Sequence, residues 1–149
     1  MARRGLGGGR PLGEVTRLHE DVDLVVELEA ISEVLAAVGE LGYSVSEDLA
    51  PVRMVLGGPE DLRADLHPVT FSEDGTGWQL GAAADGSDCP YPPSGSVEGR
   101  ILDHRVPCIS AELQLEHHCG YEPRDRDWSD MARLAKRFGL TARRAYRWE

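Results

Sequence analysis

Aspartate residues at alternate positions are the feature of this sequence best suited to chemistry. Asp21 and Asp23 lie in a segment, Leu18 to Leu28, in which apolar and acidic residues alternate, and a period of two is typical of a β-strand. Side chains two residues apart on a strand share one face, so we expect these two carboxylates to point together. Because like charges held close together repel, a partly buried pair is costly unless a cation neutralises it. The pattern therefore indicates a Mg²⁺ site, since Mg²⁺ commonly takes one or two carboxylates together with substrate phosphates.

A third carboxylate, Asp65, lies on a second predicted strand, Leu62–Phe71. It can join a metal site and also take a proton from an attacking hydroxyl, as two-metal transfer sites with ions ~3.5–4 Å apart require. His67 shares its strand face. Two interpretations of His67 stay open: it orients Asp65 or a substrate, or it only caps the strand before Pro68. A solvated strand face is the alternative for the aspartate pair, because a lone Asp-x-Asp motif is common.

The elements that must position these side chains form an α+β fold, a mixed β-sheet with flanking helices. An apolar stripe at helical spacing predicts a helix over residues 29–41, ended by Gly42. Residues 81–96, rich in Gly, Pro, Ser and Asp, are expected to form a loop. The remaining predicted elements are the strands Tyr43–Ser46 and Val52–Leu56, a hairpin of Val97–Leu102 and Arg105–Ile109, a helix from the N-cap Ser110 to about His118, and a helix over Asp127–Phe138.

Composition narrows the class of protein. A length of 149 residues fits one domain, and the net charge of −10 disfavours nucleic-acid binding, which needs clustered Lys and Arg. The acidic balance suits a divalent cation or an amine-bearing small molecule, although it also serves solubility alone. No apolar run approaches the ~20 residues of a membrane span, and no secretory signal is expected. The three cysteines, Cys89, Cys108 and Cys119, are widely spaced, which favours a reducing compartment such as the cytoplasm.

Several motifs together resemble a known enzyme family. A glycine-rich stretch followed by Asp-x-Asp in a strand is similar to the nucleotidyltransferase superfamily of polymerase beta. The match narrows to the lincosamide nucleotidyltransferases of the LinA-like type and the aminoglycoside 2''-adenylyltransferases, and it runs from about residue 5 to 138. The segments that carry it are Leu12–Leu24, Asp65–Pro68, Pro107–Leu115, His117 with Gly120–Glu122, and Asp127 with Asp130–Met131.

The resemblance implies a nucleotidyltransferase-like fold and a Mg²⁺-dependent reaction. Asp21 and Asp23 would bind Mg²⁺ and the phosphates of ATP. Asp65 would be the third metal ligand and the general base, so that these three aspartates form the catalytic set. AMP would pass from ATP to a hydroxyl of a small antibiotic such as a lincosamide or an aminoglycoside. Partners would be the nucleoside triphosphate and the drug, with a homodimer expected because related enzymes can build the acceptor pocket between subunits.

The N-terminal segment carries the expected nucleotide contacts. Gly7 and Gly8 would let backbone N–H groups approach the phosphates, and Arg17 would add a cationic contact. Two registers stay open, because an alignment without a gap places Arg4 where the family has its first glycine. The chain begins almost at the glycines, so we expect a form that is shortened at the N-terminus relative to the family. Residues 141–149, basic and aromatic, are expected to be a flexible tail.

Two further functions stay open at this point. A toxin-type nucleotidyltransferase acting on tRNA or protein would share the motifs, although tRNA would favour a basic surface. A catalytically silent member that binds nucleotide or a partner chain is the other alternative. The cluster His117–Cys119 is not expected to bind zinc, because neighbouring residues of a helix diverge by ~100° and cannot all face one ion.

Overall fold

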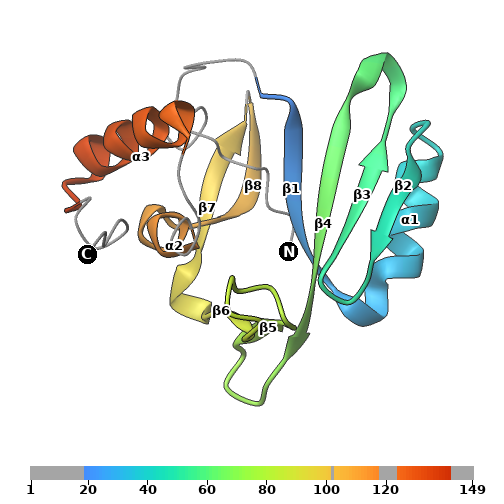
Figure 1. Ribbon diagram of the computed structural model, residues 1–149, viewed down its shortest axis with the longest axis horizontal. Helices are drawn as coiled ribbons and strands as arrows, with labels where there is room; N and C mark the ends of the chain where they lie inside the picture. Colours follow the sequence, from blue (N-terminus) through green and yellow to red (C-terminus); the bar gives the residue numbers. More distant parts are fainter. Residues whose placement is uncertain (1–18, 102, 118–123, 142–149) are drawn as a thin grey trace. The chain divides into compact units, whose positions relative to one another are not determined.

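The computed structural model describes residues 19–101, 103–117 and 124–141, and these residues fall into two compact units. The first unit contains His19–Pro93, and the second continues from Ser94. Each unit has its own sheet and its own helical packing (Figure 1). The expected single domain over the whole length stays a prediction.

The first unit is built on a mixed sheet, as the alternating patterns predict. Within the described residues this sheet has six strands, and β2, β3, β4, β5 and β6 follow one another in that order, while β1 pairs with β4. The pairing of β1 with β4 is parallel, whereas β4 is antiparallel to both β3 and β5. The strands are β1 (Asp21–Glu27), β2 (Ser44–Leu49), β3 (Arg53–Gly57), β4 (Arg63–Phe71), β5 (Gly77–Gln79) and β6 (Cys89–Tyr91).

Among the described residues, helix α1 (Ile31–Gly39) packs against the apolar residues of this sheet. Its stripe of four partly buried side chains contacts a core that includes Leu56 and Leu66, both fully buried. Burying such a stripe is the main source of stability for a short helix. Gly42, at φ +84°, follows the helix in the left-handed conformation that favours glycine. The residues of α1 that contact this core are Ile31, Val34, Leu35 and Val38.

The described part of the second unit holds a hairpin and two helices. Strands β7 (Ser96–Ile101) and β8 (His104–Ile109) are antiparallel, as the sequence predicts. Helix α2 (Ala111–His117) begins after Ser110, whose Oγ accepts the Leu113 N–H at 3.2 Å, so the predicted N-cap is confirmed. Helix α3 (Asp125–Phe138) ends at Gly139, which has φ +66°. The apolar contacts between α2 and α3 are made by Ala111, Leu115, Met131 and Leu134.

Some predicted boundaries were wrong. The segment 81–96 is not only a loop, because it holds β6 and a 3₁₀ turn at Pro93–Gly95. Strands β5 and β6 have three residues each, which is too short to produce a period-two pattern, and the middle residue of β6 is Pro90. Strand β2 extends to Leu49, beyond the predicted Ser46, but it is an exposed edge strand without an apolar face.

Candidate metal and catalytic site

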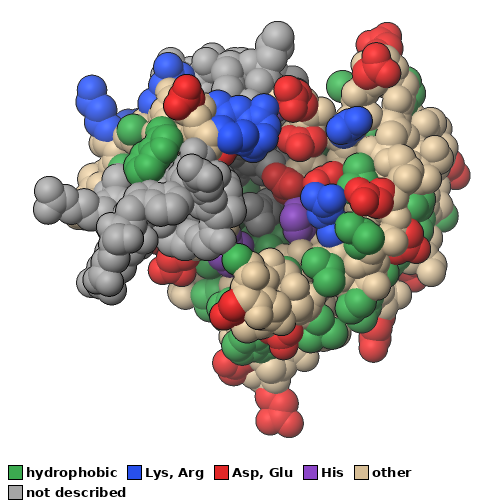
Figure 2. All heavy atoms as spheres, viewed as in Figure 1, with side chains coloured by type: hydrophobic (Ala, Val, Ile, Leu, Met, Phe, Trp, Pro, Cys, Tyr) green, Lys and Arg blue, Asp and Glu red, His purple; other side chains and the backbone are tan. Residues whose placement is uncertain are grey.

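The pairing of β1 with β4 brings two of the predicted aspartates together. In this parallel ladder Asp23 lies directly opposite Asp65. Alternate residues of the same strands, Val26 and Leu66 among them, join the core against α1. Since successive side chains on a strand point to opposite faces, the two carboxylates share the sheet face that α1 does not cover. Acidic, basic and histidine side chains gather over this part of the first unit (Figure 2).

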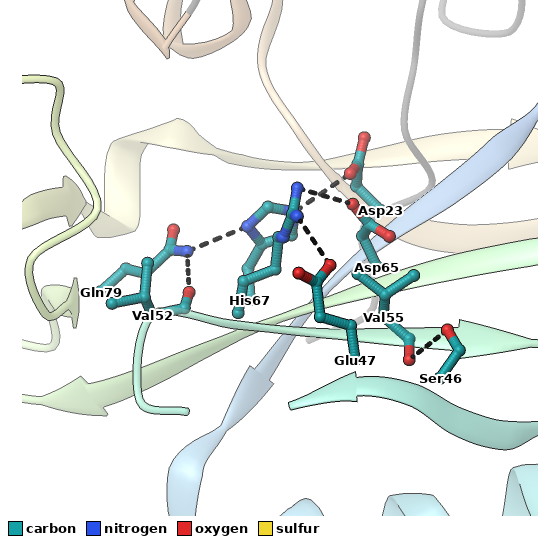
Figure 3. Close-up of polar contacts among 9 residues, drawn as sticks. Asp23, Ser46, Glu47, Val52, Val55, Asp65, His67 and Gln79 are labelled. Carbon is teal, nitrogen blue, oxygen red and sulfur yellow. Dashed lines mark hydrogen bonds and ion pairs between the residues drawn. The ribbon is translucent and has the colours of Figure 1, made fainter. Parts of the chain in front are cut away.

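Asp23, Asp65 and His67 form one cluster of possible metal ligands. Each offers one ligand atom, and these atoms all lie within 4.8 Å of one another. Their side chains retain only part of their exposure, 27% for Asp23, 15% for Asp65 and 18% for His67. The cluster is therefore reachable from solvent yet partly desolvated, which strengthens its electrostatic interactions. Figure 3 shows the three side chains converging from β1 and β4.

Asp21 shares the face but has a different position. It begins β1, is exposed, and lies opposite Arg63 in the ladder. Within the described part of the chain it is not a member of the cluster whose ligand atoms lie within 4.8 Å of one another. Its charge nevertheless acts on the cluster, because it contributes to raising the pKa of Asp65. A role for Asp21 as a metal ligand stays a prediction.

The Asp65 carboxyl holds its proton more tightly than an ordinary aspartate. Burial raises its pKa most, and the neighbouring charge of Asp23 raises it further. The charge of Arg53 acts in the opposite direction but does not cancel these effects. The guanidinium of Arg53 lies 3.6 Å from Asp65 Oδ2 and 3.3 Å from Glu47 Oε2, with 41% of its side chain exposed. The site therefore has an excess of negative charge that a bound cation would relieve.

His67 contacts Asp23, not Asp65. Its Nε2 lies 3.0 Å from Asp23 Oδ1, and its Nδ1 lies 3.0 Å from Gln79 Nε2 (Figure 3). Of the two interpretations left open, an orienting role is thus supported by geometry, although the carboxylate concerned is the other one. The sequence had not indicated Arg53 or Gln79, since neither belongs to a motif. Gln79 lies on the short strand β5, and only the fold brings it to His67.

The predicted nucleotide-binding residues Gly7, Gly8 and Arg17 lie outside the described residues, as do His118 and Cys119. Cys108 is buried in the second unit, where desolvation raises the pKa of its thiol. Among the helices that the structure describes, none combines the length and the apolar character needed to cross a membrane.

Comparison with known proteins agrees with this geometry. The sequence profile of the aminoglycoside-2''-adenylyltransferase family matches residues 5–134. The chain belongs to this family. A lincosamide resistance protein of Staphylococcus haemolyticus is 30% identical over 122 residues, which are 82% of this chain and 74% of that protein. A 2''-aminoglycoside nucleotidyltransferase of Klebsiella pneumoniae is 34% identical over 99 residues, 64% of this chain and 53% of that protein.

Solved structures support the same assignment. The crystal structure of the lincosamide antibiotic adenylyltransferase LnuA with bound lincomycin matches with a TM-score of 0.74 and 28% identity, covering 87% of this chain and 81% of that one. The crystal structure of ANT(2'')-Ia with adenylyl-2''-tobramycin matches with a TM-score of 0.73, covering 97% and 80%. At 21% identity the latter shows the fold alone. The predicted α+β nucleotidyltransferase fold and the enzyme class, a nucleotidyltransferase, are confirmed.

The donor set of this family member suits a hard divalent cation. Carboxylate oxygens are the ligands that Mg²⁺ prefers, and Asp23 and Asp65 supply them from two paired strands. Burial raises the pKa of Asp65 most and the charge of Asp23 raises it further, and the charge of Arg53 offsets these effects only in part. A cation between the carboxylates would remove this imbalance, so the residues fit the metal that the family resemblance implies.

Proposed function

We propose that this family member transfers AMP from ATP to a hydroxyl of a small antibiotic, a lincosamide or an aminoglycoside, in a Mg²⁺-dependent reaction. The observation that carries the proposal is the convergence of Asp23 and Asp65 within one cluster of ligand atoms. Names of relatives support the acceptor class, since they include a lincosamide resistance protein and a 2''-aminoglycoside nucleotidyltransferase. The availability of ATP favours action in the cytoplasm, and a homodimer stays part of the proposal.

In the proposed reaction the acceptor oxygen forms a bond to the α-phosphorus of ATP. The bond from that phosphorus to the bridging oxygen breaks, and pyrophosphate leaves. Asp23 and Asp65, with Asp21 beside them, would hold Mg²⁺, which neutralises phosphate charge and orients the phosphates. Asp65 would take the hydroxyl proton on a carboxylate oxygen. Its raised pKa supports this role, because an acidic group accepts a proton more readily when its pKa lies closer to neutrality.

The test combines the donor, the metal and a panel of acceptors. Purified protein with Mg²⁺ and each of the four ribonucleoside triphosphates is incubated with lincomycin, clindamycin, tobramycin or no acceptor. We expect pyrophosphate release with ATP and one drug class, and mass spectrometry should show the drug with one added AMP. Omission of Mg²⁺ should abolish release. This panel separates the two drug classes, which the acidic cluster alone does not distinguish.

Two variants test Asp23 as the proposed metal ligand, one by removing its charge and the other as a control. Asp23→Asn should abolish Mg²⁺-dependent release while preserving the circular dichroism spectrum. Glu73→Gln removes one charge from an exposed turn of the same unit, so it should behave as the wild type. If the wild type releases no pyrophosphate with any acceptor and shows no Mg²⁺-dependent binding of ATP, the proposal is wrong and a catalytically silent protein is the better interpretation.

A further inference from the structure

A chain of hydrogen bonds leads from β6 to the acidic cluster; it is buried at its Tyr91 end and part-buried from Gln79 onward. The hydroxyl of Tyr91 donates to Gln79 Oε1 at 2.8 Å, and Gln79 Nε2 donates to the backbone oxygen of Val52 at 2.7 Å. The same nitrogen lies 3.0 Å from His67 Nδ1, and His67 Nε2 lies 3.0 Å from Asp23 Oδ1. Tyr91 and Gln79 are only 5% and 4% exposed. Buried polar groups of this kind are held in defined orientations by their partners.

The Val52 carbonyl and the Tyr91 hydroxyl together determine which way the Gln79 amide lies. A backbone carbonyl only accepts hydrogen bonds, so the nitrogen of the amide must face it. The amide oxygen then faces the Tyr91 hydroxyl, which donates to it. The opposite orientation would place Gln79 Oε1 against the Val52 oxygen, leaving two acceptors facing each other in a part-buried place, which is costly.

This orientation in turn determines the tautomer of His67. The second hydrogen on Gln79 Nε2 points to His67 Nδ1, so Nδ1 must accept and carries no hydrogen. In a neutral imidazole the other nitrogen then carries it. Nε2 is therefore a donor, and its partner is Asp23 Oδ1. Figure 3 shows His67 held between Gln79 on one side and Asp23 on the other.

We propose that Tyr91 and Gln79 are positioning residues that fix His67 in the Nε2–H tautomer, so that His67 orients the Asp23 carboxylate and is not itself a metal ligand. A ring nitrogen that carries a hydrogen has no lone pair for a cation. Of the three members of the cluster, Asp23 and Asp65 then supply the ligand oxygens. The consequence for metal binding rests on the proposed function, whereas the tautomer does not.

The tautomer can be measured without metal or substrate. Long-range ¹H–¹⁵N spectra of metal-free protein labelled at histidine distinguish Nδ1–H from Nε2–H, and the spectrum of His67→Asn assigns the His67 signals by their loss. We expect His67 in a single Nε2–H form. Any hydrogen on Nδ1, in a second tautomer or in a doubly protonated ring, would overturn the proposal while leaving the transferase assignment intact.

Two substitutions of Gln79 test what fixes the ring. Gln79→Glu replaces the N–H donor with an acceptor, so the His67 hydrogen should appear on Nδ1. If that variant does not fold, Gln79→Leu removes the donor without adding an acceptor, and both tautomers should appear. An unchanged, pure Nε2–H form in the folded variant would show that Gln79 does not position His67.

Removal of one tyrosine hydroxyl tests the far end of the chain. Loss of a hydrogen-bonding residue that lies beyond the metal ligands commonly changes metal affinity by ~10–100-fold. We therefore expect Tyr91→Phe to weaken binding of Mg²⁺ alone by about tenfold, as measured by calorimetric titration. Tyr43→Phe is the matched control, because Tyr43 packs against the apolar core on the other side of the sheet and should bind Mg²⁺ as the wild type does. Equal affinities in the two variants would contradict a positioning role for Tyr91. Absence of Mg²⁺ binding in the wild type would instead count against the proposed function, and the spectra would still decide the tautomer.

Discussion

The two faces of strand β4 have opposite chemistry although they come from the same nine residues. Ala64 and Leu66 join the apolar core against α1, with Leu66 fully buried. Asp65 and His67, between and beside them, form the polar cluster on the other face. One face gains stability by removing apolar surface from water. The other holds like charges close together, which opposes folding and at the same time prepares a site for a cation.

The largest expected effect is a loss of enzymatic activity when the polar face of β4 is changed. Asp65→Asn keeps the shape of the side chain but removes the proposed ligand charge and proton acceptor. A general base typically contributes ~10²–10⁴-fold to a rate, so we expect kcat to fall by at least about a hundredfold, measured as pyrophosphate release under saturating ATP and drug. A fall of less than tenfold in a folded variant would remove Asp65 from the catalytic set.

A matched change on the apolar face should affect stability instead. Leu66→Ala leaves a cavity in the core against α1, and such deletions commonly lower the free energy of unfolding by about 2–5 kcal/mol. Urea denaturation measures this loss. The remaining folded protein should retain the kcat of the wild type, because Leu66 points away from the cluster. If kcat per folded molecule fell as far as in Asp65→Asn, the two faces would not be functionally separate.

The same contrast explains which features the sequence could predict. Two local patterns carry most of the prediction: the alternation around Asp23 and Asp65, and the helical spacing from Ile31 to Val38. The sheet, α1 and the shared face of the aspartates follow from these patterns. The facing of Asp23 and Asp65 needs the parallel pairing of β1 with β4. No local pattern specifies which strands become neighbours, and the family resemblance implied only that the three aspartates form one site.

The supporting residues could not be predicted for a physical reason. Gln79 reaches His67 only because β4 turns back into β5, a strand of three residues with no pattern of its own. Tyr91 lies on β6, another strand of three residues, and its buried hydroxyl donates to Gln79. Arg53 reaches Asp65 across the β3–β4 ladder. Each contact depends on tertiary geometry, and each residue alone is of a type common on ordinary strands.

The smallest expected effect is the stability cost of the charged face, and it should depend on pH. The pKa of Asp65 in the folded protein is raised above its ordinary value of 3.8, by burial first and by Asp23 second. Below 3.8 both the folded and the unfolded chain carry the proton, and the residue contributes no pH dependence. As the pH rises from there to the raised pKa, the unfolded chain releases its proton more readily, so the free energy of unfolding of the wild type falls.

In the variant Asp65→Asn the side-chain amide cannot lose a proton, so its free energy of unfolding lacks this decline with rising pH. In metal-free buffer, the stability of the wild type relative to Asp65→Asn should therefore decrease between pH 4 and neutrality, as measured by urea denaturation across that range, while Glu73→Gln should follow the wild type. Added Mg²⁺ should reverse the order at neutral pH, because a ligand that binds only the folded state stabilises it by ~2.7 kcal/mol at a hundredfold excess over its Kd. Parallel pH curves for the wild type and Asp65→Asn would mean that Arg53 already balances the charge of Asp65, and that the uncovered face carries no strain for a cation to relieve.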